Sequence, residues 1–81
     1  MSIEERIKKV LFENALKDVD PKEVTNSSQL IEFGVGLDSI ATLELVVALE
    51  EEFQIRIDES EISAETFQTI NSMSRHITEK L

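Results

Sequence analysis

A serine at the junction of a loop and a helix is the residue of this chain best placed to do chemistry. It stands in the run Gly36-Leu37-Asp38-Ser39-Ile40, where loop-forming residues give way to a helical pattern. Asp38 is a good N-cap, which makes Ser39 the first helical residue and leaves its hydroxyl pointing outward. A phosphate attached to that hydroxyl would meet unpaired backbone N–H groups and the positive end of the helix dipole. Because Asp-Ser is also a common capping dipeptide, the run indicates a phosphate-linked group only if the rest of the chain agrees.

The other reactive residues do not suggest a catalytic or metal site. As a nucleophile Ser39 would need a base, and the single histidine, His76, falls off the apolar stripe of its helix, so we expect it at the surface. The three consecutive glutamates at 50–52 splay around a helix and do not converge. The acidic turn at 58–61 lacks the glycine and the terminal glutamate of an EF-hand loop, so we expect it to be solvated. The chain has no cysteine, which excludes disulfides and thiolate sites. We expect no enzymatic activity and no bound metal.

Helical periodicity dominates the segments that must position the serine. The pattern predicts, in order, a helix over residues 2–17, a loop from Asp20-Pro21 to about 38, a helix over 38–53, a short helical turn near 59–63 and a last helix from about Thr66. The residues between 53 and 59 resemble a lone strand without a partner and are interpreted as a connection. We therefore expect an all-α bundle of three main helices plus one short helix, in a single domain over residues 1–81.

The charge of the chain limits its partners. It has 17 acidic and 8 basic residues among 81, which gives a net charge of −9 at pH 7. Such a chain is repelled by nucleic acids and by anionic lipid surfaces, whereas it suits a basic protein surface. The N-terminal residues lack the basic and apolar regions of a secretory signal, and no apolar run is long enough to span a membrane. We expect a cytoplasmic monomer that interacts with basic proteins and does not insert into membranes.

The second helix carries two apolar faces. The face expected to pack inward consists of Leu45, Val46, Leu49 and Phe53. Ile40 and Val47 fall roughly opposite, beside the acidic residues Glu44 and Glu51, and Leu43 lies at the border. Stray apolar residues are common on any surface, but an apolar centre with an acidic rim also suits a docking surface.

The wider pattern resembles the acyl carrier protein family. Besides the serine run, the resemblance rests on Leu43-Glu44-Leu45, on Ala48-Leu49-Glu50-Glu51-Glu52-Phe53, on Ile57-Asp58, on Ile3-Glu4-Glu5-Arg6-Ile7-Lys8-Lys9-Val10 and on Glu23-Val24-Thr25-Asn26. Nearly the whole chain is covered. The resemblance implies an acyl-carrier-like four-helix bundle in which Ser39, preceded by Asp38, accepts 4′-phosphopantetheine from coenzyme A. A separate phosphopantetheinyl transferase would catalyse that step with Mg²⁺, and acyl groups would be carried as thioesters on the arm.

Two surfaces around the serine are expected to handle partners and cargo. The docking face for basic patches on acyl synthases, transferases or ligases is predicted to comprise Ile40, Leu43, Glu44, Val47, Glu50, Glu51 and Asp58. The acyl pocket is predicted to be formed by Leu45, Val46, Leu49, Ile57, Ile62, Phe67 and Ile70. These aliphatic and aromatic side chains would shelter a hydrocarbon chain from water.

Some positions depart from the usual pattern of fatty acid carriers. Ala41 stands where they usually have another acid, Val47 where many have methionine, and residues 33–37 differ from their usual loop. The predicted role is therefore in fatty acid, polyketide or specialised lipid biosynthesis, with an aminoacyl- or peptidyl-type carrier as one alternative. A helical interaction module without a cofactor is the other.

Overall fold

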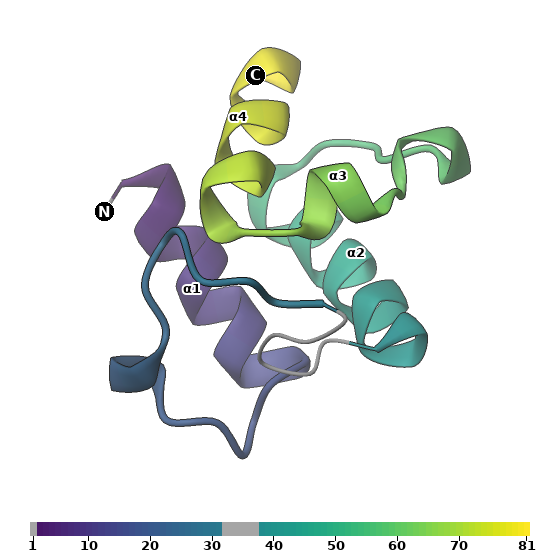
Figure 1. Ribbon diagram of the computed structural model, residues 1–81. Helices are drawn as coiled ribbons and strands as arrows, with labels where there is room; N and C mark the ends of the chain where they lie inside the picture. The colour runs from purple at the N-terminus through teal and green to yellow at the C-terminus, as the bar shows by residue number, and fades with distance from the viewer. Residues whose placement is uncertain (1, 32–37) are drawn as a thin grey trace.

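The computed structural model describes residues 2–31 and 38–81, and it is helical in both ranges (Figure 1). The elements are α1 (Ile3–Asn14), η1 (Pro21–Glu23), α2 (Ser39–Phe53), η2 (Glu59–Glu61), α3 (Ala64–Phe67) and α4 (Ile70–Lys80). These ranges contain no strand, so the all-α class with three main helices and one short helix is confirmed. Among these helices, none has the length and apolar character needed to cross a bilayer.

The first helix ends earlier than its periodicity predicts. Ser2 caps it as expected, because the Ser2 hydroxyl accepts from the backbone N–H of Glu5 at 3.1 Å and the Glu5 side chain accepts in return. The helix stops at Asn14, however, and not near residue 17. After it, the backbone N–H of Leu16 donates to the carbonyl of Leu11 at 2.9 Å, and the Leu16 side chain is buried. The chain turns at this point because that turn places Leu16 in the core.

The predicted last helix is in fact two helices. Instead of one helix starting near Thr66, α3 ends at Phe67 and α4 begins at Ile70. Thr69 separates them: its backbone is extended, and its hydroxyl accepts from the backbone N–H of Ser72 at 3.0 Å. This N-cap starts a new helix in a new direction. Phe67 and Ile70, on either side of the break, are both buried.

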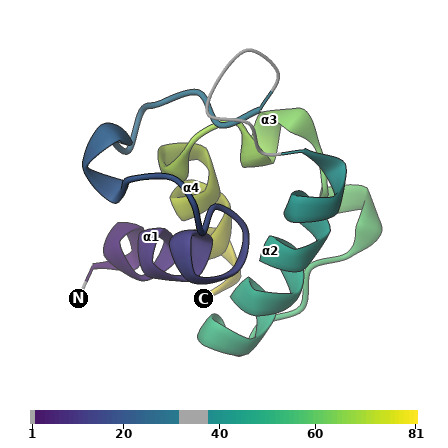
Figure 2. The same cartoon turned by 90° about the horizontal axis from the view of Figure 1, so that it is seen from below.

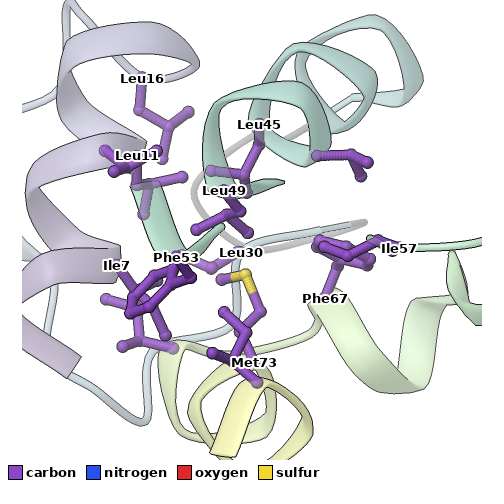
Figure 3. Packing of buried hydrophobic residues seen from close by; sticks show 14 of the residues in the cluster. Ile7, Leu11, Leu16, Leu30, Leu45, Leu49, Phe53, Ile57, Phe67 and Met73 are labelled. Carbon is purple, nitrogen blue, oxygen red and sulfur yellow. The ribbon is translucent and has the colours of Figure 1, made fainter. Parts of the chain in front are cut away.

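The core lies between α1, α2 and α4. Figure 2 shows α1 and α2 on either side of the interior, with α3 near the N-terminal end of α2. Figure 3 shows the side chains that fill this space. The most completely buried are Ile7, Leu11, Leu30, Leu45, Leu49, Ile70, Met73 and Ile77. Phe12, on the far side of α1, is half-buried against this cluster.

Arg6 ties α1 to the C-terminal end of α2. Its Nε donates to the Glu52 carboxylate and its Nη2 to the Glu52 carbonyl, both at 2.9 Å, while the guanidinium lies 4.3 Å from the centroid of the Phe53 ring. Planar donors and stacking on an aromatic ring are properties of arginine that lysine lacks. The interaction secures the end of α2 that is farthest from Ser39.

Candidate functional site

The start of α2 is built as the sequence predicts. Asp38 has extended backbone angles, and its Oδ1 accepts from the backbone N–H of Ala41 at 2.7 Å. The Asp38 carbonyl accepts from the backbone N–H of Thr42 at 2.9 Å and from the Thr42 hydroxyl at 2.7 Å. Ser39 is thus the first residue of the helix, and it is exposed to solvent. Gly36 and Leu37, the first residues of the motif, lie outside the described residues, as do all of 33–37.

A pocket of about 360 Å³ opens beside Ser39. It lies between α2, the segment around α3 and Ile31 of the long loop. Its lining residues are Ile31, Asp38, Ser39, Thr42, Leu43, Ile62, Ser63, Ala64 and Phe67. Most of these side chains offer hydrocarbon to the pocket. A group attached to the Ser39 hydroxyl would therefore have its phosphate at the positive end of α2 and an apolar space within reach.

The predicted pocket residues divide into two groups. Ile62 and Phe67 line the pocket. The other predicted members lie in the closed core and do not line it: Leu45, Val46, Leu49, Ile57 and Ile70. They were predicted as lining because the inward face of a helix does not reveal which of its residues border a cavity.

Besides Asp38 and Ser39 of the attachment motif, five lining residues were not predicted for the pocket. Leu43, which was assigned to the docking face, borders the pocket as well. Thr42 lies three residues after Ser39, so helical spacing alone could have placed it on the same side. Ser63 is the N-cap of α3, Ala64 is its first residue, and Ile31 comes from the loop. These three belong to segments without a regular periodicity, so no sequence signal brings them to α2.

The predicted docking face is largely an exposed surface. Ile40, Leu43 and Val47 are 69%, 58% and 56% exposed, and their spacing of three and four residues groups them on one side of α2. Glu44 and Glu51 are exposed around them, and Asp58 is exposed beyond the end of α2. An exposed apolar centre with carboxylates nearby is the composition of a contact surface for a basic partner.

One residue predicted for this face, Glu50, has other surroundings than expected. Glu50 is half-buried, and its Oε2 accepts from the backbone N–H of Ile57 at 2.8 Å, so this carboxylate holds the chain that leaves α2. Ala41 is half-buried against the core and does not belong to the exposed surface. The exposed part of the predicted docking face therefore does not include Glu50 in full.

A carboxylate clamp holds the pocket wall opposite α2. Glu61 Oε1 accepts from His76 Nε2 at 2.7 Å and from Lys80 Nζ at 2.8 Å, and Glu61 Oε2 accepts from the backbone N–H of Asp58 at 2.7 Å. The hydrogen bond from Lys80, followed by that from the Asp58 backbone, lowers the pKa of Glu61 to about 2. The clamp fastens η2 to α4 one residue before the lining residue Ile62.

The clamp corrects two predictions. His76 was expected to be a surface histidine, but it is half-buried and hydrogen-bonded to Glu61. The acidic turn at 58–61 was expected to be solvated, but Glu61 is bound by two side chains of α4. Both contacts join residues 15 or more positions apart, which helical spacing cannot anticipate.

The amino-acid sequence is similar to a known protein family and to characterised members of it. A family model described as "Phosphopantetheine attachment site" matches residues 9–77. The acyl carrier protein of Caulobacter vibrioides (strain NA1000 / CB15N) is 41% identical over 76 residues, which cover 94% of this chain and 91% of that protein. The acyl carrier protein of Buchnera aphidicola subsp. Acyrthosiphon pisum (strain Tuc7) is 42% identical over 76 residues, covering 94% of this chain and 85% of that protein.

The clamp leads to a pH-dependent prediction. Because the folded-state pKa of Glu61 is about 2 and its ordinary value is 4.5, its contribution to stability is complete above about pH 4.5 and is lost as the pH falls toward 2. We expect Glu61→Gln to lower the melting temperature by a few degrees at pH 7. The gap to the wild type should narrow progressively between pH 4.5 and pH 2.

Thermal melts followed by circular dichroism would measure this gap. Glu59→Gln, in the same turn but exposed, is the matched control and should leave the melting temperature nearly unchanged. Equal melting temperatures for Glu61→Gln and the wild type at pH 7 would contradict the clamp, as would a gap that stays constant to pH 2.

Proposed function

This chain belongs to the acyl carrier protein family, and on that premise we propose that the Ser39 hydroxyl is the attachment point of its phosphopantetheine arm. The observation that carries the proposal is the position of Ser39: it is exposed, it is the first residue of α2, and it lies at an apolar pocket. A cofactor-free interaction module would need none of these features.

Other serines are less suited to the attachment. Ser63 also borders the pocket, but its hydroxyl caps α3 by accepting from the backbone N–H of Thr66 at 3.2 Å. The Ser72 hydroxyl is hydrogen-bonded to Thr66 and Thr69, and Ser74 is buried. Ser60 is exposed, but it lies in the η2 turn and does not line the pocket. Ser39, in contrast, is exposed, borders the pocket and is the first residue of α2.

The chemistry is divided between the arm and the chain. The arm supplies a terminal thiol that holds the acyl group as a thioester, a function this cysteine-free chain cannot provide itself. The chain supplies the hydroxyl, the positive helix end for the phosphate and the apolar space for the cargo. The sole histidine is engaged by Glu61, so the base that takes the Ser39 proton during attachment would come from a phosphopantetheinyl transferase.

The docking face is proposed to bind the transferase and the enzymes that load or use the acyl group. Ile40 and Val47 provide apolar contact, while Glu44 and Glu51 would pair with basic residues of each partner. The net charge of −9 would speed the encounter with such partners and disfavour association between copies. We propose that the chain works in the cytoplasm as a monomeric carrier domain.

The first test of this function is the attachment itself. Incubation of the unmodified protein with coenzyme A and a broad-specificity phosphopantetheinyl transferase should add one phosphopantetheine mass, because Ser39 is accessible at the helix end. Intact-protein mass spectrometry measures the change. Ser39→Ala should gain no mass, whereas Ser60→Ala, which alters another exposed serine, should be modified like the wild type. Modification mapped to a different serine would refute the assignment of Ser39.

The second test addresses the docking face. Reversing both charges in the variant Glu44→Lys/Glu51→Lys should slow modification by about tenfold or more at low ionic strength, since steering by exposed charges is lost. The loss should shrink at high salt because exposed charges are screened. Time courses of the mass gain would give the rates.

A matched control has the same change in net charge at another place. Glu13→Lys/Glu79→Lys alters two exposed carboxylates on α1 and α4, and it should keep most of the wild-type rate. Far-ultraviolet circular dichroism should report unchanged helicity for both variants. Equal rates for the two double variants would mean that overall charge, and not this face, guides the partner.

A further inference from the structure

The chain between α2 and α4 includes a stretch without a buried side chain, residues 58–66, which we call the strap. Each of its residues is exposed or half-buried, including its one large apolar residue, Ile62. Ile57 before it and Phe67 after it are 7% and 2% exposed, so the core holds both ends. Figure 1 shows the strap leaving the end of α2, passing through η2 at the edge of the molecule and returning with α3 to α4. Burial of apolar surface therefore fixes its ends and stabilises little of its middle.

Hydrogen bonds to other segments reinforce the two ends. The backbone N–H of Ile57 donates to the Glu50 carboxylate at 2.8 Å, just before the strap. At the other end, the Thr66 carbonyl accepts from the Ser72 hydroxyl at 2.7 Å. Both bonds lie at a boundary of the strap, so they can persist while the residues between them move.

Between these ends, the Glu61 clamp is the one polar fastening to another element in the part of the chain that the structure describes. Glu61 Oε1 accepts from His76 Nε2 at 2.7 Å and from Lys80 Nζ at 2.8 Å, both on α4. The other hydrogen bonds of residues 59–65 stay within the strap and α3. A short segment with this little burial needs less free energy to open locally than the whole fold needs to unfold.

The charge of the strap makes this fastening decisive. The strap carries four carboxylates and no basic residue, in a chain whose net charge is −9. Lys80 is the basic residue in the last turn of α4, and through Glu61 it holds the strap against the molecule. Without Lys80 and His76 on Glu61, the strap would face mainly the repulsion of other carboxylates, so an open position would gain population.

The strap also forms one side of the opening beside Ser39. Ile62, Ser63 and Ala64 border that opening, whereas no described residue of α4 does. A change in the last turn of α4 would therefore reach the surroundings of Ser39 through the Glu61 clamp.

We propose that the strap is a hinged flap and that the Glu61 clamp is the latch that keeps it closed. Ile57 and Phe67 serve as the hinges. When the clamp releases, the strap opens as a unit while α1, α2 and α4 remain folded. The last turn of α4 thereby controls the opening beside Ser39 from a distance. This device goes beyond the proposed function, because it does not depend on what Ser39 carries.

Native-state hydrogen exchange, followed by nuclear magnetic resonance at increasing urea concentration, tests the flap in the full chain. Three strap amides are hydrogen-bonded in the closed position: those of Glu61, Ile62 and Thr66. Because a flap exposes little new surface, these amides should share one level of protection that hardly changes at low urea. The amide of Leu11, in the buried part of α1, should instead exchange faster and faster as urea promotes global unfolding.

Removing the clamp should release the strap. Glu61→Gln and Lys80→Met should each speed exchange at Ile62 and Thr66 by roughly tenfold, because each removes a charge-assisted hydrogen bond. The shallow urea dependence of these amides should remain. The double variant should gain less than the product of the two single effects, since both act on one contact.

Matched controls change neighbouring residues that do not belong to the clamp. Glu59→Gln alters an exposed carboxylate of the strap, and Arg75→Met alters an exposed basic residue of α4. Both should leave exchange at the strap amides within about twofold of the wild type, a change too small to reflect a lost hydrogen bond to a charged group.

The proposal is overturned if the strap amides match Leu11 in protection and in steep urea dependence, because the strap would then open only when the whole molecule unfolds. It is also overturned if the two clamp variants leave strap exchange unchanged. If a clamp variant does not fold, the comparison of strap and Leu11 amides in the wild type still decides. The Ser39→Ala protein should give the same exchange pattern, so failure of attachment at Ser39 would not affect this result.

Discussion

The hydrogen bond from the Ala41 backbone to the Asp38 carboxylate, 2.7 Å long, fixes where α2 begins, and the site depends on that position. An N-cap of this kind contributes about 1 kcal/mol to helix stability. Its larger consequence is geometric, because the residue at which a helix starts determines the direction of every later side chain. With Asp38 as the cap, Ser39 lies at the exposed end, Leu45 and Leu49 enter the core, and Val47 faces solvent.

The two sides of the pocket are held in different ways. The α2 side belongs to a helix of 15 residues whose far end is fixed to α1 by Arg6. The opposite side consists of a 3-10 turn and the four-residue helix α3, which cannot bury much surface of their own. They are positioned by hydrogen bonds and ion pairs: the Glu61 clamp to α4 and the caps at Ser63 and Thr69. The proposed cargo pocket thus lies where a 15-residue helix meets a short segment that is held at a few points.

The sequence was sufficient to predict the features that depend on local spacing. The cap at Asp38, the extent of α2 and the outward direction of Ile40 and Val47 all follow from one helix and its period, and they are confirmed. The boundary between α3 and α4 was missed because the apolar spacing from Phe67 to Ile77 continues across the break. Only the hydrogen bonds of the Thr69 cap reveal it.

Features that join distant segments could not be predicted in this way. The half-buried state of His76 depends on Glu61, which lies 15 residues earlier, and Glu50 reaches the backbone of the chain after α2. Ile31 borders the pocket, but it belongs to a loop without periodicity, so its sequence pattern could not predict this position. Resemblance to a family supplied the chemistry at Ser39, whereas the depth of the pocket comes from the burial of particular side chains.

If Ser39 carries the arm, the acyl chain should lie between α2 and the segment around α3. Amide chemical shifts of the holo and hexanoyl forms, compared in two-dimensional ¹⁵N spectra, would locate the chain. We expect changes at Thr42, at residues 62–64 and at Phe67, with Ile7 and Leu11 of α1 unaffected. Changes confined to Ser39, Ile40 and Ala41 would show that the acyl chain stays in solvent and does not enter the pocket.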